Sequence, residues 1–310
     1  MKHYLSRIEK IKKEFAIDGN EHFVVAESGT NHKVFLSDHL VIRFRDDNPQ
    51  LLLRETKFLK KLNHPLIPKI LQSGKIDQSF FMIENRLTGQ TIDSVWRNLS
   101  ADNKKNIIRQ VVSFLEYQKT LIKNDAYSVK TGKKYRRFSD YLMENIKQKT
   151  TAIEKFGQAD KIVKDILSIM DDSSIKNLFD NPKTTLVHGD LIIHNLLTDG
   201  KGLTGVLDWE MASLGDPDYD LCRLFYYQEC AKAYEEQGAD ETFESDYMDS
   251  LMTAISESGL VKNRKIFQKK YRFARAVFYF NALEWAANSK SPDENIDELI
   301  EKWGKAGSDN

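Results

Sequence analysis

Apolar and polar positions follow a strand-like pattern in the first third of the chain. Between Phe23 and Glu84, short runs rich in β-branched or aromatic residues are separated by turn residues, which is typical of strands. The predicted strands are residues 23–26, 33–36, 40–44 and 80–84. Within this part, apolar positions from Leu51 to Leu62 recur at helical spacing and stop before a His-Pro pair, which predicts one helix among the strands.

The pattern becomes helical after Gly89. An apolar stripe from Ile107 to Ile122 predicts a long helix with Ser100 as its N-cap. A second stripe lies at residues 162–170. Short strands then interrupt the helical pattern, at residues 185–187 and 203–207.

These two patterns predict an α+β protein with two lobes. We expect a small β-rich N-terminal lobe of residues 1–88 and a larger, mainly helical C-terminal lobe of residues 89–310, joined by a connector at about residues 84–89. A cleft between two lobes is a common place for a ligand.

The composition narrows the class of protein. The 310 residues include 46 basic and 46 acidic side chains, so the charge balance gives no indication of nucleic-acid binding. No stretch approaches the roughly 20 consecutive apolar residues that span a bilayer, and the charged N-terminal segment lacks the apolar core of a secretory signal. Cys222 and Cys230 do not have the spacing of a metal site or a disulfide framework. We therefore expect a cytoplasmic monomer or dimer with neither membrane nor nucleic acid as a partner.

One segment, from Leu186 to Leu221, concentrates residues able to do chemistry. Asp190 could accept a proton from a hydroxyl or orient it. Asn195 and Asp208 offer an amide oxygen and a carboxylate, which suit Mg²⁺ when phosphate oxygens and water complete its shell. Each residue alone could be an ordinary turn residue, but the ordered set favours phosphoryl transfer.

The same segment resembles the aminoglycoside phosphotransferase family, whose relatives include the choline kinases. The resemblance rests on His188-Gly189-Asp190, Asn195, Asp208-Trp209-Glu210, Gly215-Asp216-Pro217 and Asp220-Leu221. It implies a two-lobed protein-kinase-like fold in which Asp190 is the catalytic aspartate and Asn195 and Asp208 are the Mg²⁺ ligands. It also implies that His188 and Asp220 brace the catalytic loop. Ile192-Ile193-His194 departs from the His-Pro-Gly often found in the family.

The resemblance also implies a nucleotide site. A cation on the α/β-phosphates would be Arg43, where the family more often has lysine, and its acidic partner would be Glu55. Arg45 competes for that role because it lies two residues on, on the same face of a strand.

Two further segments correspond to nucleotide-binding parts of the family. Ser28, Gly29 and Thr30 lie where the family has its phosphate-covering loop, although their spacing fits an ordinary hairpin turn equally well. Backbone groups from Glu84 to Arg86 would bind the base, so ATP and GTP remain open as the phosphate donor. The chain contains no P-loop motif.

The acceptor is expected to be a small molecule. Ile192 replaces the lysine usual in protein kinases, and the seven residues between Asp208 and Asp216 leave no room for an activation loop. An aminoglycoside-type antibiotic is our leading acceptor, with a metabolite or macrolide as the alternative and an inactive kinase-fold binding module as a third reading. Carboxylates after Asp220 could attract a polycation or form a solvated face, and Glu210 could meet a substrate amine. Aromatic and charged residues between Tyr271 and Trp285 could form a sugar-binding wall or ordinary core.

Overall fold

The computed structural model describes residues 2–18, 21–26, 33–180, 183–236 and 242–307, and these fall into two compact units. The first contains residues 1–110, 129–132 and 192–212, and the second contains residues 111–128, 133–191 and 213–310. The chain therefore passes from one unit to the other more than once. The lobe boundary near residue 88 stays a prediction.

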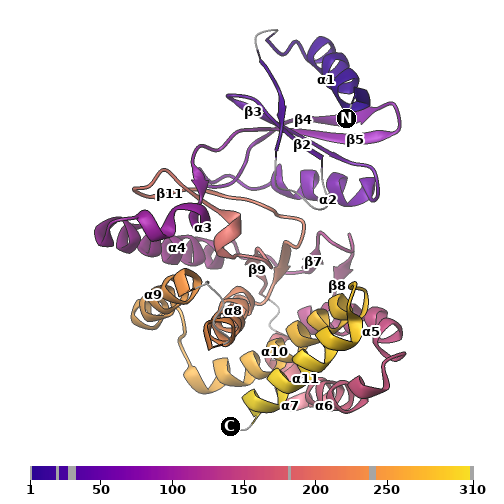
Figure 1. Cartoon of the computed structure of the whole chain (residues 1–310), viewed down its shortest axis with the longest axis vertical. Coiled ribbons are helices and arrows are strands. Elements are labelled where there is room, and N and C mark those ends of the chain that lie inside the picture. The colour runs from indigo at the N-terminus through magenta and orange to yellow at the C-terminus, as the bar shows by residue number, and fades with distance from the viewer. Residues whose placement is uncertain (1, 19–20, 27–32, 181–182, 237–241, 308–310) are drawn as a thin grey trace. The chain divides into compact units, whose positions relative to one another are not determined.

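The first unit contains a five-stranded antiparallel sheet (Figure 1), with strand order β1-β2-β3-β5-β4. Its strands are β1 (Val24–Val25), β2 (Lys33–Leu36), β3 (Leu40–Arg45), β4 (Ile70–Ile76) and β5 (Ser79–Asn85). The predicted strands are confirmed, and β4 is an addition that the sequence pattern did not indicate. Its mixed run of polar residues and a glycine hides the strand pattern.

One face of this sheet packs against helix α1 (Lys2–Glu14). Successive strand residues point to opposite faces, so Ile42 and Phe44 of β3 lie on this side together with Phe81 of β5. They meet Tyr4 and Ile8 of α1 in one apolar cluster. The alternate residues of the same strands therefore point to the opposite face of the sheet.

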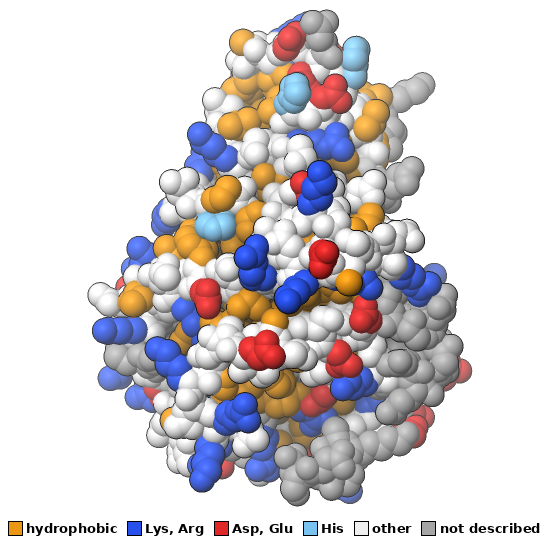
Figure 2. Space-filling model, turned by 90° about the vertical axis from the view of Figure 1, so that its left-hand side faces the viewer, with side chains coloured by type: hydrophobic (Ala, Val, Ile, Leu, Met, Phe, Trp, Pro, Cys, Tyr) orange, Lys and Arg blue, Asp and Glu red, His pale blue; other side chains and the backbone are white. Residues whose placement is uncertain are grey.

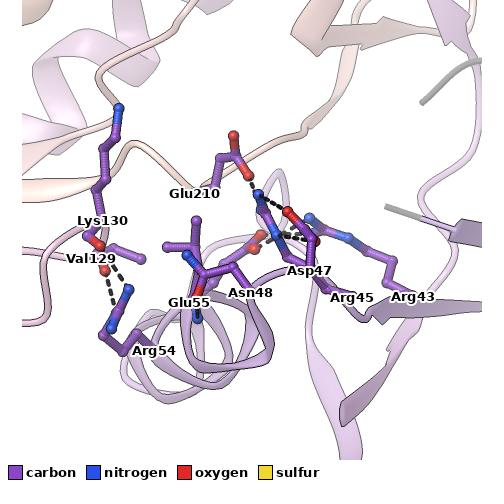
Figure 3. A network of polar contacts seen from close by, with 10 residues as sticks. Arg43, Arg45, Asp47, Asn48, Arg54, Glu55, Val129, Lys130 and Glu210 are labelled. Carbon is purple, nitrogen blue, oxygen red and sulfur yellow. Dashed lines mark hydrogen bonds and ion pairs between the residues drawn. The ribbon is translucent and has the colours of Figure 1, made fainter. Parts of the chain in front are cut away.

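Helix α2 (Pro49–Leu59) packs against the strands β3, β4 and β5. Asn48 caps it by accepting a hydrogen bond from the Leu51 amide at 3.2 Å, and proline occupies its first turn, where no amide is needed. Arg54 ties α2 to another part of the unit by donating to the carbonyls of Val129 and Lys130 at 2.9 and 2.7 Å (Figure 3). The buried carboxyl of Glu55 is thereby held beside the sheet.

The rest of the first unit carries a second, three-stranded sheet in the order β11-β10-β6. Its elements are β6 (Gln90–Thr91), α3 (Ile92–Val95), η1 (Trp96–Asn98), residues 101–110 of α4 (Ala101–Thr120), η4 (Ile193–Asn195), β10 (Leu196–Thr198) and β11 (Leu203–Val206). The predicted cap of α4 is confirmed, because the Asn103 amide donates to Ser100 Oγ at 3.3 Å.

The second unit is mainly helical and contains a four-stranded sheet in the order β8-β7-β12-β9. Its strands are β7 (Ala126–Ser128), β8 (Lys134–Tyr135), β9 (Thr185–Val187) and β12 (Ser213–Gly215). Its helices beyond α4 are α5 (Phe138–Ile153), η2 (Gly157–Ala159), α6 (Asp160–Asp171), α7 (Ser173–Lys176), η3 (Asn177–Phe179), α8 (Tyr219–Glu236), α9 (Thr242–Ser258), α10 (Arg264–Ala287) and α11 (Pro292–Gly307).

Helix α10 is the central helix of the second unit. Every residue from Phe273 to Phe280 is buried, as expected for a helix surrounded by others, and α5, α6, α8 and α11 pack around it. The predicted α+β class is confirmed. Among the described helices, none is both long enough and apolar enough to cross a membrane.

Candidate functional site

The loop after β9 is braced by Asp220, in the first turn of α8. Its buried carboxylate accepts hydrogen bonds from the amides of His188 at 2.7 Å and Gly189 at 2.8 Å. Gln118 donates to it at 2.8 Å. Gly189 has a φ of 84°, which glycine adopts without strain, and the His188 ring accepts from the Asp190 amide at 3.2 Å. The predicted bracing by His188 and Asp220 is confirmed.

The same helix face holds the side chain of Asp190. The Tyr227 hydroxyl donates to Asp190 Oδ1 at 2.7 Å, and Arg223 Nη2 donates to the same oxygen at 3.3 Å. Arg223 Nε also donates to the Tyr227 oxygen at 3.0 Å. The sequence analysis did not identify Arg223 or Tyr227 as site residues. Their spacing of three and seven residues from Asp220 places all three on one face of a helix.

A hairpin brings Asn195 and Asp208 together in the first unit. Strands β10 and β11 pair antiparallel, with Leu196 opposite Val206. The pairing continues by one step, because the Leu207 amide donates to the Asn195 carbonyl at 2.8 Å. Asp208 follows directly, with a φ of 60° in the left-handed region. Such backbone in a residue other than glycine is concentrated at functional sites.

Asn195 and Asp208 line a cavity of about 470 Å³ within the first unit. Its walls are largely apolar and include Val34, Leu36, Val41, Leu87, Leu197 and Leu207. Its polar residues include Arg43, Glu84 and Glu210. Pockets of this volume, apolar with a few convergent polar groups, are typical of small-molecule sites.

Arg43 and Glu55 form a buried ion pair at this cavity. Arg43 Nη1 and Nη2 donate to Glu55 Oε1 and Oε2 at 2.7 and 3.2 Å, and the Glu55 side chain has no exposed surface (Figure 3). Two parallel bonds of this kind fix the orientation of both groups. The pairing expected from the sequence is therefore present.

The side chain of Arg45 pairs with different residues from those that bind Arg43. It donates to Asp47 at 3.2 Å and to Glu210 at 2.5 Å, and it is not among the residues that line the cavity. Of the two candidate cations, Arg43 is the one that lines the cavity, and its contact with a nucleotide stays a prediction. Glu210, which the sequence suggested as a partner for a substrate amine, forms an ion pair with Arg45 (Figure 3). Its contact with a substrate stays a prediction.

Backbone amides at the end of β5 and in the connector after it donate hydrogen bonds to carbonyl groups of the protein. The Asn85 amide donates to the Lys69 carbonyl at 3.1 Å, and the Arg86 amide donates to the His39 carbonyl at 2.8 Å. Glu84 is buried and is one of the residues that line the cavity. Ser28, Gly29 and Thr30 lie outside the described residues, so their predicted contact with phosphate stays a prediction.

The cavity residues provide the donors that a Mg²⁺ ion would need. Asn195 and Asp208 supply an amide oxygen and a carboxylate, the hard oxygen ligands that Mg²⁺ prefers, and both lie on the same cavity. Across the described residues, no three His, Cys, Asp or Glu side chains converge as a metal cluster. A Mg²⁺ ion held here would therefore complete its shell with water and phosphate oxygens.

The side chains between Tyr271 and Trp285 divide between core and surface. Phe278 and Tyr279 are buried in the second unit, whereas Trp285 is 67% exposed. Arg275 Nε donates to Glu229 at 2.7 Å, and the Tyr271 hydroxyl also donates to that carboxylate. Glu229 of α8 is thus bound by two residues of α10. The structure does not gather these residues into one exposed wall.

Figure 2 shows how charged side chains are distributed over one face of the molecule. Basic and acidic side chains are interspersed on it, in keeping with the equal numbers of each in the sequence.

The fold and these residues define a phosphotransferase-like protein, and comparison with known proteins gives the family. Residues 23–250 match the family model described as the phosphotransferase enzyme family, APH. This match covers well over half of the chain, so the protein belongs to this family. The aminoglycoside phosphotransferase relationship expected from the sequence is confirmed.

Individual relatives are more distant. Hygromycin-B 4-O-kinase of Escherichia coli is 36% identical over 52 residues, which are 17% of this chain and only 15% of that kinase.

Solved structures match over nearly the whole chain. Aminoglycoside phosphotransferase APH(4)-Ia has a TM-score of 0.68 at 14% identity, covering 96% of this chain and 99% of its own. A mutant of it in a ternary complex with AMP-PNP and hygromycin B has a TM-score of 0.65 at 15% identity, covering 94% and 97%. The gentamicin complex of APH(2")-IIa has a TM-score of 0.65 at 16% identity, covering 95% of each chain. These matches confirm the protein-kinase-like fold.

Proposed function

We propose that this protein transfers the γ-phosphate of a nucleoside triphosphate to a hydroxyl of a small molecule. The observation that carries the proposal is the cavity that Asn195 and Asp208 share with the Arg43–Glu55 pair. It combines oxygen ligands for Mg²⁺ with a cation for phosphate, the two requirements of phosphoryl transfer. Its largely apolar walls suit a nucleobase.

In this reaction Asp190 acts on the acceptor. Its carboxylate orients the hydroxyl and receives its proton, while the acceptor oxygen bonds to the γ-phosphorus and the bond to the β–γ bridging oxygen breaks. The nucleoside diphosphate is the leaving group. Tyr227 and Arg223 both donate to Oδ1 of Asp190, and these bonds fix the direction of the carboxylate. Positioning of this kind supplies much of the rate in phosphoryl transfer.

Arg43 would contact the phosphates, with Glu55 fixing its guanidinium. Asn195 and Asp208 would hold Mg²⁺, which supplies charge neutralisation on the phosphate oxygens when it is bound. Ser28, Gly29 and Thr30 would cover the phosphates, and the segment from Glu84 to Arg86 would contact the base. A large cost of misplacing any of these groups is expected, because there is little covalent chemistry to compensate.

The acceptor we favour is an aminoglycoside-type antibiotic. Support comes from the relatives, whose names include a hygromycin-B kinase and complexes with hygromycin B and gentamicin. A metabolite or macrolide acceptor is the alternative within the same chemistry. Free Cys222 and Cys230 support a reducing, cytoplasmic location.

A screen for nucleoside diphosphate release tests the proposal. Purified protein is given Mg²⁺ with ATP or GTP and a panel of hygromycin B, gentamicin, a macrolide, choline and simple sugars. We expect acceptor-dependent release and a phosphate ester on one acceptor, identified by mass spectrometry. Nucleotide binding without transfer to any acceptor would favour the inactive binding module instead.

A further inference from the structure

Glu84 at the cavity is a buried carboxyl group with an unused hydrogen-bonding oxygen, which a bound ligand could satisfy. Glu84 is one of the residues that line the cavity, and its Oε2 is buried without a hydrogen-bond partner among the described residues. A buried polar atom left without a partner costs about 1–3 kcal/mol, so native proteins keep few of them. A ligand that donates a hydrogen bond to Oε2 would remove this cost.

The register of the sheet places Glu84 on the face that carries Arg43. Glu84 pairs with Val41 and Met82 pairs with Arg43, so Glu84, Val41 and Arg43 share one face of the sheet. Glu84 is the last residue but one of β5, beside the connector. Arg43 points to Glu55 of α2, and Val41 and Leu87 provide apolar surface near Glu84.

We propose that the Glu84 carboxyl reads the six-position edge of the purine ring in the nucleotide bound at this cavity. The inference rests on the proposed nucleotide-dependent function and adds a specificity-determining side chain to it. The amides of Asn85 and Arg86 already donate within the protein, whereas Glu84 Oε2 has no hydrogen-bond partner among the described residues. An ionised carboxylate accepts from the 6-amino group of adenine and repels a 6-oxo group.

The protonation state of Glu84 would then set the donor preference. Burial, opposed by Arg43 and assisted by Glu55, raises the pKa of Glu84 to about 7. A protonated carboxyl can donate to a 6-oxo group, whereas the ionised form can only accept. The preference for a 6-amino purine is therefore expected to be strong above this pH and weak below it.

Other charged groups share the cavity and must be separated from Glu84. Among the described residues they are Arg43 of β3, Arg86 of the connector, His194 of η4, and Asp208 and Glu210 after β11, with Glu55 of α2 behind Arg43. Histidine is the other side chain in this set that changes charge near neutral pH. These groups, unlike Glu84, are expected to affect all triphosphates alike.

The test compares ATP with inosine triphosphate, which differs in carrying a 6-oxo group. Dissociation constants are measured by competition with a fluorescent ATP analogue, in Mg²⁺, at about pH 6 and about pH 8, on either side of the range in which Glu84 titrates. Because both ligands carry the same triphosphate, its own titration cancels in their ratio. In the wild type we expect the preference for ATP to rise by about tenfold between the two values, the worth of one hydrogen bond to a charged group.

The variant Glu84→Gln keeps the shape but donates and accepts at every pH. It should bring the two ligands within about threefold of each other and remove the pH dependence. His194→Asn, and Glu144→Gln in the second unit, should keep the wild-type ratio and its pH dependence.

A wild-type ratio that does not change with pH, and that Glu84→Gln also leaves unchanged, would overturn the inference while the proposed function stands. Equal weakening of both ligands by Glu84→Gln would also overturn it, since that indicates support of Arg43 rather than base reading. Failure of the wild type to bind either triphosphate would overturn both the inference and the proposed function. The pH comparison in the wild type needs no variant to fold.

Discussion

Replacing Tyr227 by Phe removes one hydroxyl from the surroundings of Asp190 and leaves the aromatic ring in place. The ring lies 4.9 Å from the guanidinium carbon of Arg223, and this contact should persist in Tyr227→Phe. What disappears is the 2.7 Å hydrogen bond to Asp190 Oδ1 and the bond accepted from Arg223 Nε. Burial raises the pKa of Tyr227, so the wild-type hydroxyl remains a donor throughout the pH range of an assay.

The size of the effect follows from the charge on Asp190. A hydrogen bond to a charged group contributes about 1.5–3 kcal/mol. Arg223 still donates to the same oxygen at 3.3 Å, so the loss should fall near the lower limit. Because about 1.4 kcal/mol corresponds to tenfold in rate, we expect kcat to fall about tenfold. The KM for the nucleotide should change little, since Asp190 acts on the acceptor.

Steady-state transfer to a saturating acceptor, followed as release of nucleoside diphosphate, measures this change. Tyr226→Phe is the matched control, because Tyr226 packs on Phe278 and Tyr279 rather than on Asp190. A kcat for Tyr227→Phe equal to or above that of the wild type would refute the positioning role. So would an equal loss in both variants, which would indicate general disturbance of α8.

Two further pairs of substitutions test the nucleotide side and the second unit. Arg43→Ala should weaken binding of Mg–ATP at least about tenfold, because one charge-assisted contact is lost, whereas Arg45→Ala should weaken it less than about threefold. Isothermal titration calorimetry measures both dissociation constants. A larger loss of affinity in Arg45→Ala than in Arg43→Ala would exclude our assignment of the cation. Lys270 is buried and donates to both oxygens of Asp216 at 2.9 Å, so Lys270→Met should lower the free energy of unfolding by about 3–5 kcal/mol. The exposed Lys269→Met should change it by less than about 0.5 kcal/mol, and equal stability of the two variants in urea unfolding would contradict the argument.

Local patterns predicted much of the fold. Strands β2 and β9 begin and end where the sequence indicated, because β-branched and aromatic runs between turn residues are a local property. β4 was missed because its interior, Leu71 to Lys75, alternates poorly and contains a glycine.

Only the site residues within the recognised motif could be predicted from the sequence. Strand periodicity puts Arg43 and Arg45 on one face and cannot choose between them. The choice depends on Glu55 and Glu210, and Glu210 is 165 positions from Arg45. Arg223 and Tyr227 lie beyond the motif, and their role depends on how α8 packs against the loop of Asp190. The importance of the Glu84 side chain depends on burial, which no local pattern reports.

The most direct test of the account is transfer by the Asp190→Asn variant beside the wild type, with binding of Mg–ATP measured on the same preparations. The amide keeps the shape of the carboxylate but cannot take a proton. We predict that the wild type forms a phosphate ester on the acceptor hydroxyl. The variant should bind Mg–ATP within about threefold of the wild type and lose transfer by about a hundredfold or more, at the scale of general-base catalysis. Substantial transfer by the variant, or absence of transfer by the wild type with every acceptor, would contradict the account.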